Sequence, residues 1–211
     1  MDIIASIALS AGAAWASGIN VYAVILALGV LGGTGHLALP PDLQILTNPL
    51  IIAAAGFMYC VEFFADKTPG VDSVWDALHT FIRIPAGAML AAGTFGHIDP
   101  VLQIVAFLLG GTLAATSHAT KAGARVLINT SPEPVSNWTA SLTEDVIAFS
   151  TIWGATQHPA AWLAVLAVIM ALTVWALPKV WSGVARLFAK LKTWFRGRTE
   201  RADPPTRVIR G

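Results

Sequence analysis

The chain alternates long apolar stretches with short polar breaks over most of its length. Each stretch is close to the roughly 20 residues with which a helix crosses the apolar core of a bilayer. The expected transmembrane helices cover residues 4–31, 49–65, 73–95, 101–124, 139–156 and 160–178. The breaks are rich in proline, glycine, aspartate and asparagine, which are typical of turns and helix ends. The pattern therefore predicts an all-α polytopic membrane protein of about six helices, with a transmembrane domain over 1–180.

The first apolar stretch has a second interpretation. Residues 3–16 followed by Ser17 resemble the apolar region and small-residue cleavage site of a signal peptide. However, Met1 and Asp2 carry no positive side chain, and the apolar run continues to Leu31. We therefore expect a retained helix.

Composition excludes most classes of soluble enzyme. The chain is 55% hydrophobic and only 12% charged, whereas soluble domains are about a quarter charged. Phosphate-binding loops, zinc-protease motifs, serine-hydrolase motifs and dinucleotide fingerprints are absent from the sequence. We therefore expect no cofactor and no metal, and an enzyme is less expected than a transporter.

The basic residues predict an orientation. Residues 1–178 contain four Lys/Arg and ten Asp/Glu, whereas residues 179–211 contain nine and two. With six spans and the N-terminus inside, the outer loops carry no Lys or Arg, which is the positive-inside pattern. We therefore expect a bacterial inner (cytoplasmic) membrane protein with both termini in the cytoplasm.

The basic C-terminal region predicts a second kind of helix. Over residues 181–198, apolar and aromatic side chains recur at helical spacing, with cations on the other faces. Such an amphipathic helix is expected to lie on the membrane surface against anionic lipid headgroups, with a solvated helix as the alternative. Residues 199–211 are expected to be a disordered cytoplasmic tail, and no nucleic-acid-binding signature is present.

A weak internal similarity divides the chain into two halves. Residues 12–28 can be aligned with residues 111–127, which would make 4–97 and 101–180 a 3+3 inverted repeat of the kind found in transporters. Chance similarity between alanine-rich helices is the alternative. Small residues such as Gly29 and Gly33 would also allow a close helix contact or a homo-oligomer.

The third apolar stretch carries a polar stripe. Asp72, Asp76, His79 and Arg83 are spaced 4, 3 and 4 residues apart and so share one helical face. Arg83 lies about 16 Å along the axis from Asp72, near mid-membrane. Its guanidinium keeps its proton, so a carboxylate, a carbonyl, water or an anionic ligand must meet it.

A proline follows this stripe. Pro85 removes the helical partner of the Phe81 carbonyl, and Gly87 adds backbone freedom. We therefore expect a hinge or broken helix at Pro85 and Gly87, beside the mid-membrane cation. A packing kink with Arg83 in a structural ion pair is the alternative.

Other stretches contribute polar residues that face the same region. The candidate substrate-binding residues are Arg83, His79, His118, Lys121, Arg125 and Asn20. The candidate proton-coupling residues are Glu62, Glu144 and Asp76, because a carboxylate inside a span must be paired or have a raised pKa. Structural roles remain open: Asp76 can stabilise a first turn, Lys121 and Arg125 can snorkel, and His118 and Asn20 can hydrogen-bond between helices.

Several segments resemble a known family. They are residues 61–67, 71–76, 79–87, 117–121 and 129–134. These segments are similar to a family of small bacterial integral-membrane proteins described as a domain of unknown function. The resemblance covers about residues 10–175 and implies one membrane unit, but it implies no activity.

The residues themselves favour a carrier or channel for a small polar or charged solute. An anion is slightly favoured, because Arg83, His118, Lys121 and Arg125 converge from two spans on a polar cavity open to the cytoplasm. The bilayer and a small-molecule solute are the expected partners. A membrane enzyme acting on a lipid headgroup, with His79 or His118 as base, is one alternative, and a non-catalytic scaffold is the other.

Overall fold

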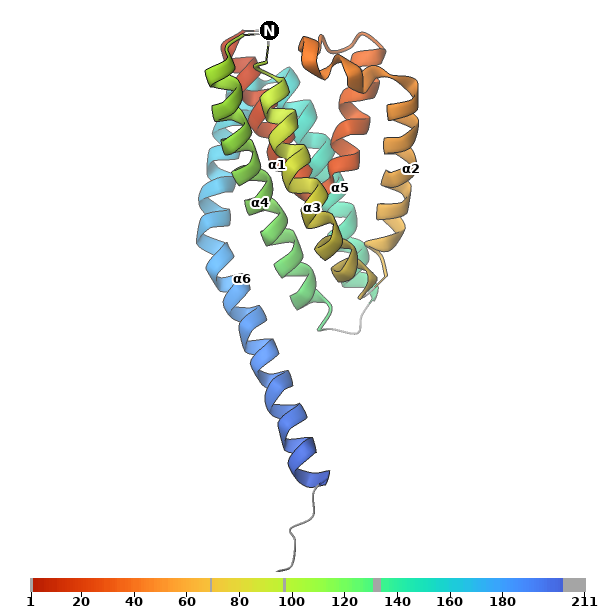
Figure 1. The fold of residues 1–211 in the computed structure, drawn as a ribbon, viewed down its shortest axis with the longest axis vertical. Coiled ribbons are helices and arrows are strands. Elements are labelled where there is room, and N and C mark those ends of the chain that lie inside the picture. The colour runs from red at the N-terminus through yellow and green to blue at the C-terminus, as the bar shows by residue number, and fades with distance from the viewer. Residues whose placement is uncertain (1, 69, 97, 131–133, 203–211) are drawn as a thin grey trace, which may run out of the picture.

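The computed structural model describes residues 2–68, 70–96, 98–130 and 134–202, and these form a helical bundle without strands (Figure 1). The elements are α1 (Ile3–Gly33), the 3-10 helix η1 (Pro41–Thr47), α2 (Pro49–Ala65), α3 (Val71–Gly93), α4 (Pro100–Ile128), α5 (Pro134–Gln157) and α6 (Pro159–Ala202). The all-α class is therefore confirmed. Most helices begin and end close to the predicted stretches, but α5 begins earlier, at Pro134, and α6 continues far beyond residue 178 to Ala202.

Proline and short polar side chains define the helix starts. Four helices, α2, α4, α5 and α6, begin with proline, whose missing N–H is not needed in a first turn. Before α2, Asn48 Oδ1 accepts a hydrogen bond from the Leu50 amide at 2.9 Å. Before α4, Asp99 Oδ1 accepts one from the Val101 amide at 2.6 Å. These caps explain why the sequence located both starts well.

Helix α1 is interrupted at Asn20, where the backbone is extended (φ −150°, ψ 95°). In Figure 1 the second half turns back towards the end of the bundle at which the first half begins. Consistent with this reversal, Ser6 lines one cavity together with Leu39, which follows the end of α1. The segment is thus a helical hairpin with its tip at Asn20, and not one continuous helix over 4–31.

The two ends of the chain lie at opposite ends of the bundle. The N-terminus lies beside the open end of the α1 hairpin, and α6 runs away from it and projects beyond the far end (Figure 1). The expected location of both termini in the cytoplasm stays a prediction. The predicted surface helix over 181–198 continues α6 without a break, so its contact with a membrane stays a prediction. Residues 203–211 lie outside the described part of the chain.

Among the described residues, three helices, and not the expected six, are long and apolar enough to cross a membrane by length and composition. They are Ile3–Gly33, Pro100–Ile128 and Pro159–Lys190; η1 and α2 together, bent by 68°, are a fourth candidate. The first of these passes only when the two halves of the α1 hairpin are counted as one helix. The two remaining helices, α3 and α5, carry charged residues that lower their hydropathy. Their outer faces are nevertheless apolar, since Phe81 on α3 is 82% exposed and Trp153 on α5 is 59% exposed.

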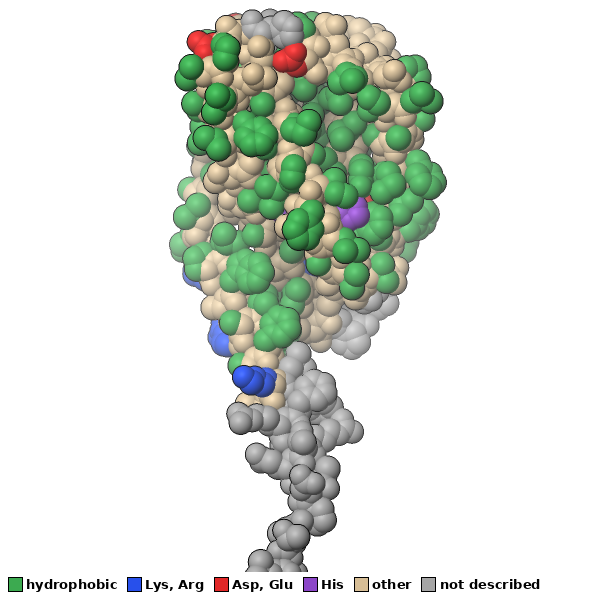
Figure 2. Space-filling view, in the orientation of Figure 1, with side chains coloured by type: hydrophobic (Ala, Val, Ile, Leu, Met, Phe, Trp, Pro, Cys, Tyr) green, Lys and Arg blue, Asp and Glu red, His purple; other side chains and the backbone are tan. Residues whose placement is uncertain are grey.

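The surface is that of a membrane protein. Hydrophobic side chains cover much of the face seen in Figure 2, and acidic side chains appear at its upper end. Large apolar side chains such as Leu50, Phe57 and Phe64 are mostly exposed, while many charged side chains are buried. Soluble proteins have the opposite distribution.

Helices α1, α3 and α4 pack closely through small residues. A Cβ atom added at Gly87 of α3 would lie 2.6 Å from Ala114 Cβ of α4 and 3.1 Å from the Ala14 carbonyl oxygen of α1. Gly87 therefore serves a close approach between helices. The expected break in α3 is absent, because the helix continues through Pro85. The interruption lies in α1 instead.

The predicted inverted repeat finds no support in this arrangement. Its alignment pairs residues 12–28 with residues 111–127. The first segment contains the reversal at Asn20, whereas the second lies within the uninterrupted helix α4.

Candidate functional site: a buried ionic cluster at the hairpin tip

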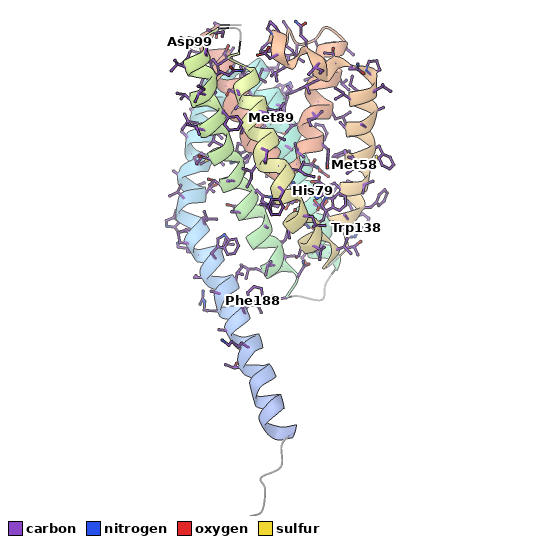
Figure 3. The ribbon with its side chains drawn as sticks, viewed as in Figure 1. Met58, His79, Met89, Asp99, Trp138 and Phe188 are labelled. Carbon is purple, nitrogen blue, oxygen red and sulfur yellow. The ribbon has the colours of Figure 1, made fainter. Side chains whose placement is uncertain are left out.

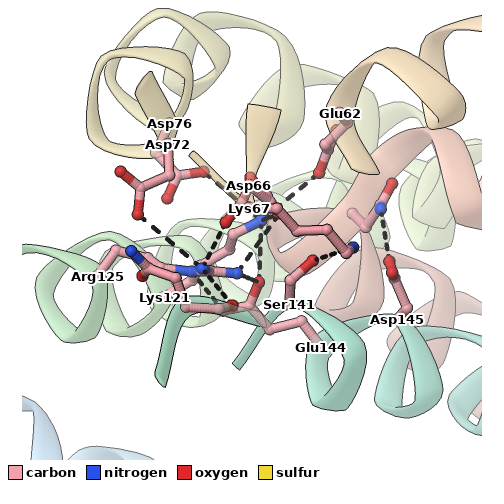
Figure 4. A network of polar contacts seen from close by, with 12 residues as sticks. Glu62, Asp66, Lys67, Asp72, Asp76, Lys121, Arg125, Ser141, Glu144 and Asp145 are labelled. Atoms are coloured by element: carbon pink, nitrogen blue, oxygen red, sulfur yellow. Dashed lines mark hydrogen bonds and ion pairs between the residues drawn. The ribbon is translucent and has the colours of Figure 1, made fainter. Parts of the chain in front are cut away.

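Ten charged side chains gather between the tip of the α1 hairpin and the end of the bundle where α2 joins α3, and Figure 4 labels all of them except Arg83. This ionic cluster consists of Glu62, Asp66, Lys67, Asp72, Asp76, Arg83, Lys121, Arg125, Glu144 and Asp145. Nine of the ten are buried, and the Glu144 side chain is 17% exposed. Charge at this depth persists only when partners compensate it.

Arg83 bridges two carboxylates. Its Nη2 lies 2.7 Å from Glu62 Oε1, and its Nη1 lies 2.6 Å from Asp76 Oδ1, with all three side chains at most 1% exposed. Nη1 also donates to His118 Nδ1 at 3.2 Å. His118 Nδ1 must then be the acceptor, so Nε2 carries the proton and donates to Thr80 Oγ1 at 2.7 Å. His118 is therefore a neutral member of the network.

Lys121 is surrounded by carboxylates. Its Nζ donates to Asp66 Oδ2 at 2.9 Å. Oxygen atoms of Glu144, Glu62 and Asp76 lie 3.3, 3.5 and 3.6 Å from the same nitrogen. One ammonium group is thus shared by four acids. They are Glu62 of α2, Asp66 directly after α2, Asp76 of α3 and Glu144 of α5.

Arg125 joins the turn after α2 to α5. Its Nε and Nη2 bind the two Glu144 carboxylate oxygens at 3.1 and 2.6 Å. Its Nη1 donates to the main-chain oxygens of Asp66 and Asn137 at 2.9 and 3.3 Å. Lys121 and Arg125 are both buried, so neither extends outward as the snorkelling interpretation requires.

The hairpin tip is held by the same cluster. Asn20 Oδ1 accepts a hydrogen bond from the Ala23 amide at 2.9 Å, which caps the second half of α1. Its Nδ2 donates to Asp145 Oδ1 at 3.2 Å. Lys121 Nζ donates to the Ile19 carbonyl oxygen at 3.0 Å, at the end of the first half. Both helix ends exposed by the reversal therefore find partners.

His79 lies on the same face of α3 but outside the ion pairs (Figure 3). Its Nδ1 is 2.9 Å from the Trp75 carbonyl oxygen and its Nε2 is 3.0 Å from the Tyr22 hydroxyl. The carbonyl can only accept, so Nδ1 carries a proton. The ring also stacks on Trp75 with 4.1 Å between centroids. These contacts hold His79 in a structural position against α1.

The ionic cluster has more acids than bases. It holds six carboxylates and four cations, a formal excess of two negative charges. One carboxylate oxygen each of Glu62, Asp66, Asp76 and Asp145 is buried without a hydrogen-bond partner. No group of three or more His, Cys, Asp or Glu residues within the described ranges could hold a metal ion. The described part of the cluster therefore carries an uncompensated formal negative charge in a buried position.

Most of the candidates named from the sequence meet in this cluster. The residues brought together are Glu62, Asp76, Arg83, His118, Lys121, Arg125 and Glu144, with Asn20 joined through Asp145. The sequence prediction did not include Asp66, Lys67 and Asp145. Asp145 shares a helical face with Ser141, four residues earlier, and this spacing was the available signal.

The cavities between the helices lie elsewhere. Those between α1 and α4, between α3 and α4, and between α1 and α5 are lined mainly by apolar side chains and by no member of the ionic cluster. None of them is the polar cavity open to the cytoplasm that the sequence predicts.

Comparison with known proteins identifies one family. Neither the curated proteins nor the solved structures contain a significant match to the chain. The sequence model of one family matches residues 7–179, which include most of the hairpin and every member of the ionic cluster. The chain therefore belongs to the family described as a domain of unknown function (DUF4126).

Proposed function

We propose that the chain is a membrane carrier or channel that moves a small polar or charged solute and exchanges protons at the ionic cluster. The observation that carries this proposal is a buried excess of carboxylates packed against a helix that reverses at mid-bundle. Interrupted helices with charged partners form the solute and ion sites of many secondary transporters. Buried ionisable residues in a membrane protein serve transport or proton transfer in many such proteins.

The membrane arrangement is part of the proposal. Helices α2 to α6 each cross the bilayer, and the α1 hairpin enters and leaves from one side. The charges of α3 and α5 are compatible with crossing, because they face the bundle interior and the outer faces are apolar. The basic residues favour a cytoplasmic location for the end of the bundle that carries the cluster. The N-terminus then lies on the outer side and the C-terminus in the cytoplasm.

The charge balance favours a proton or a cation over an anion. An anion would be drawn to Arg83, Lys121 or Arg125, but carboxylates already lie within 2.9 Å of each of these cations. Binding an anion there would add to a formal negative excess in a buried site. A proton or a small cation would reduce it.

Reconstitution in liposomes tests the proposal. Purified protein is incorporated into vesicles that contain a pH-sensitive dye, and sodium, potassium, ammonium, phosphate or acetate is added outside. We expect proton movement that requires the protein and one of these solutes, with a cation more effective than an anion. Absence of protein-dependent movement of protons and of all five solutes would overturn the proposal.

A scaffold role is the second candidate, because the cluster is buried and densely paired. In that case the charges lock the helices together and move nothing. The triple variant Glu62→Gln, Asp76→Asn, Arg83→Met removes the central ion pairs without leaving an unpaired charge among those three residues. If the chain is a scaffold, the triple variant folds, and neither it nor the wild type shows proton flux in vesicles. If the chain is a proton-exchanging carrier, the triple variant folds but loses the flux that the wild type shows.

A further inference from the structure

Two buried histidines, His79 of α3 and His118 of α4, have hydrogen-bond partners at both ring nitrogens. The partners differ in one chemical respect. One nitrogen of His79 meets a hydroxyl group, which can donate or accept, whereas one nitrogen of His118 meets a guanidinium group, which can only donate. This difference decides how each ring responds to a second proton.

His118 has no acceptor for a second proton. Its Nδ1 accepts from Arg83 Nη1 at 3.2 Å, and its Nε2 lies 2.7 Å from Thr80 Oγ1. The Thr80 hydroxyl donates to the Asp76 carbonyl oxygen at 3.1 Å, so it accepts the Nε2 proton of His118. A proton added at Nδ1 would place two donors and two positive charges against each other. The hydrogen bond to Arg83 must then break.

His79 is not sensitive in this way. Its Nδ1 donates to the Trp75 carbonyl oxygen at 2.9 Å, and its Nε2 lies 3.0 Å from the Tyr22 hydroxyl. The hydroxyl donates to the neutral ring and, after rotation about its C–O bond, accepts from the charged ring. The contact with α1 is therefore kept in both protonation states, which makes His79 the natural comparison for His118.

The surroundings of His118 come from three helices. The charged groups that act on its ring are Arg83 and Asp76 of α3 and Lys121 of α4, and α1 contributes the main chain of Gly18. A Cβ atom added at Gly18 would lie 2.9 Å from the His118 amide nitrogen, so the hairpin packs directly on α4 at this point. His118 thus lies where the hairpin tip, α3 and α4 meet.

We propose that His118 is a positioning residue for Arg83, and that its protonation at acid pH releases Arg83 and stops proton exchange at the ionic cluster. The neutral ring keeps Nη1 of Arg83 beside Asp76, while Nη2 binds Glu62. On acidification one N–H bond forms at Nδ1 with a proton from water, and the hydrogen bond from Arg83 to Nδ1 breaks. This inference deepens the proposed function and rests on it.

The pH profile of proton flux in vesicles tests the inference, with each variant scaled to its own maximum. We expect wild-type flux to fall roughly tenfold between about pH 7 and pH 5, the range that includes the ordinary titration of histidine. His118→Gln keeps an acceptor and a donor but takes up no proton, so the fall is expected to disappear. His79→Gln and the exposed control His158→Gln are expected to retain it. No fall in the wild type, or the same fall in His118→Gln, would overturn the inference and leave the proposed function standing.

A second measurement does not need transport. NMR of protein with isotopically labelled histidine and arginine distinguishes a bare ring nitrogen from a protonated one. Near neutral pH we expect His118 to show a bare Nδ1 and a protonated Nε2. On acidification the Arg83 guanidinium signal is expected to move together with the His118 ring, and to stay in place in His118→Gln.

This measurement also separates the two proposals. A protonated Nδ1 near neutral pH, or an Arg83 signal that moves equally in His118→Gln, would overturn the positioning role. If wild-type vesicles show no flux at any pH, the proposed function fails, and the NMR result still decides whether His118 holds Arg83.

Discussion

Replacement of Arg83 by methionine tests how far the ionic cluster holds the bundle together. Methionine fills a similar volume but leaves Glu62 and Asp76, at 2.7 and 2.6 Å from the guanidinium, without their main cation. Removing one partner of a buried ion pair costs about 3–5 kcal/mol. Lys121, at 3.5 and 3.6 Å from the same two carboxylates, compensates only in part. We therefore expect a loss of about 3–5 kcal/mol, or roughly two to four powers of ten in the unfolding equilibrium.

Reversible unfolding in mixed detergent micelles measures this change. Lys179→Met, at an exposed position of α6 outside the ionic cluster, is the control and is expected to stay within about 0.5 kcal/mol of the wild type. The triple variant Glu62→Gln, Asp76→Asn, Arg83→Met is expected to recover most of the loss, because no charge of that group is left unpaired. A loss below about 1 kcal/mol in Arg83→Met, or no recovery in the triple variant, would refute the argument from buried charge.

Three further predictions follow from the hairpin and its packing. Asn20→Ala removes the cap of the second half-helix and is expected to cost about 1–2 kcal/mol in the same unfolding assay; an unchanged stability would contradict the capping role. Gly87→Val places a side chain where a Cβ already meets Ala114 at 2.6 Å and should cost about 1–3 kcal/mol, whereas Gly111→Ala, with its nearest neighbour at 3.4 Å, should be tolerated. Cysteines at positions 2 and 34, introduced after replacing Cys60 by serine, should react with an impermeant maleimide from the same side of sealed vesicles, and labelling from opposite sides would exclude the hairpin.

The sequence predicts well what depends on local pattern. Apolar stretches preceded by proline give most helix starts within a few residues, because a helix start needs only a capping side chain and a free first turn, whereas the end of α6 at Ala202 lies far beyond the predicted one. The spacing of Asp72, Asp76, His79 and Arg83 correctly predicts that all four lie on the buried face of α3. That result follows from the geometry of one helix alone.

The features that the sequence misses depend on distant partners. The reversal at Asn20 occurs within an apolar run without proline, and its polar contacts come from Lys121 and Asp145, more than 100 residues away. The break expected at Pro85 is absent, because close packing around Gly87 leaves α3 continuous. Local propensity is a weak guide when tertiary contacts satisfy the freed backbone groups.

The hairpin and the ionic cluster depend on each other physically. A helix that reverses inside an apolar bundle exposes carbonyl groups at one end and amide groups at the other, and no water is available there to satisfy them. Lys121 meets the Ile19 carbonyl, and Asn20 meets the Ala23 amide while binding Asp145. The same Lys121 lies within 3.6 Å of four carboxylates, so one ammonium group joins the hairpin tip to the acids of the ionic cluster. Under the proposed function, this shared ammonium group is the connection through which a change of charge in the cluster would act on the hairpin tip.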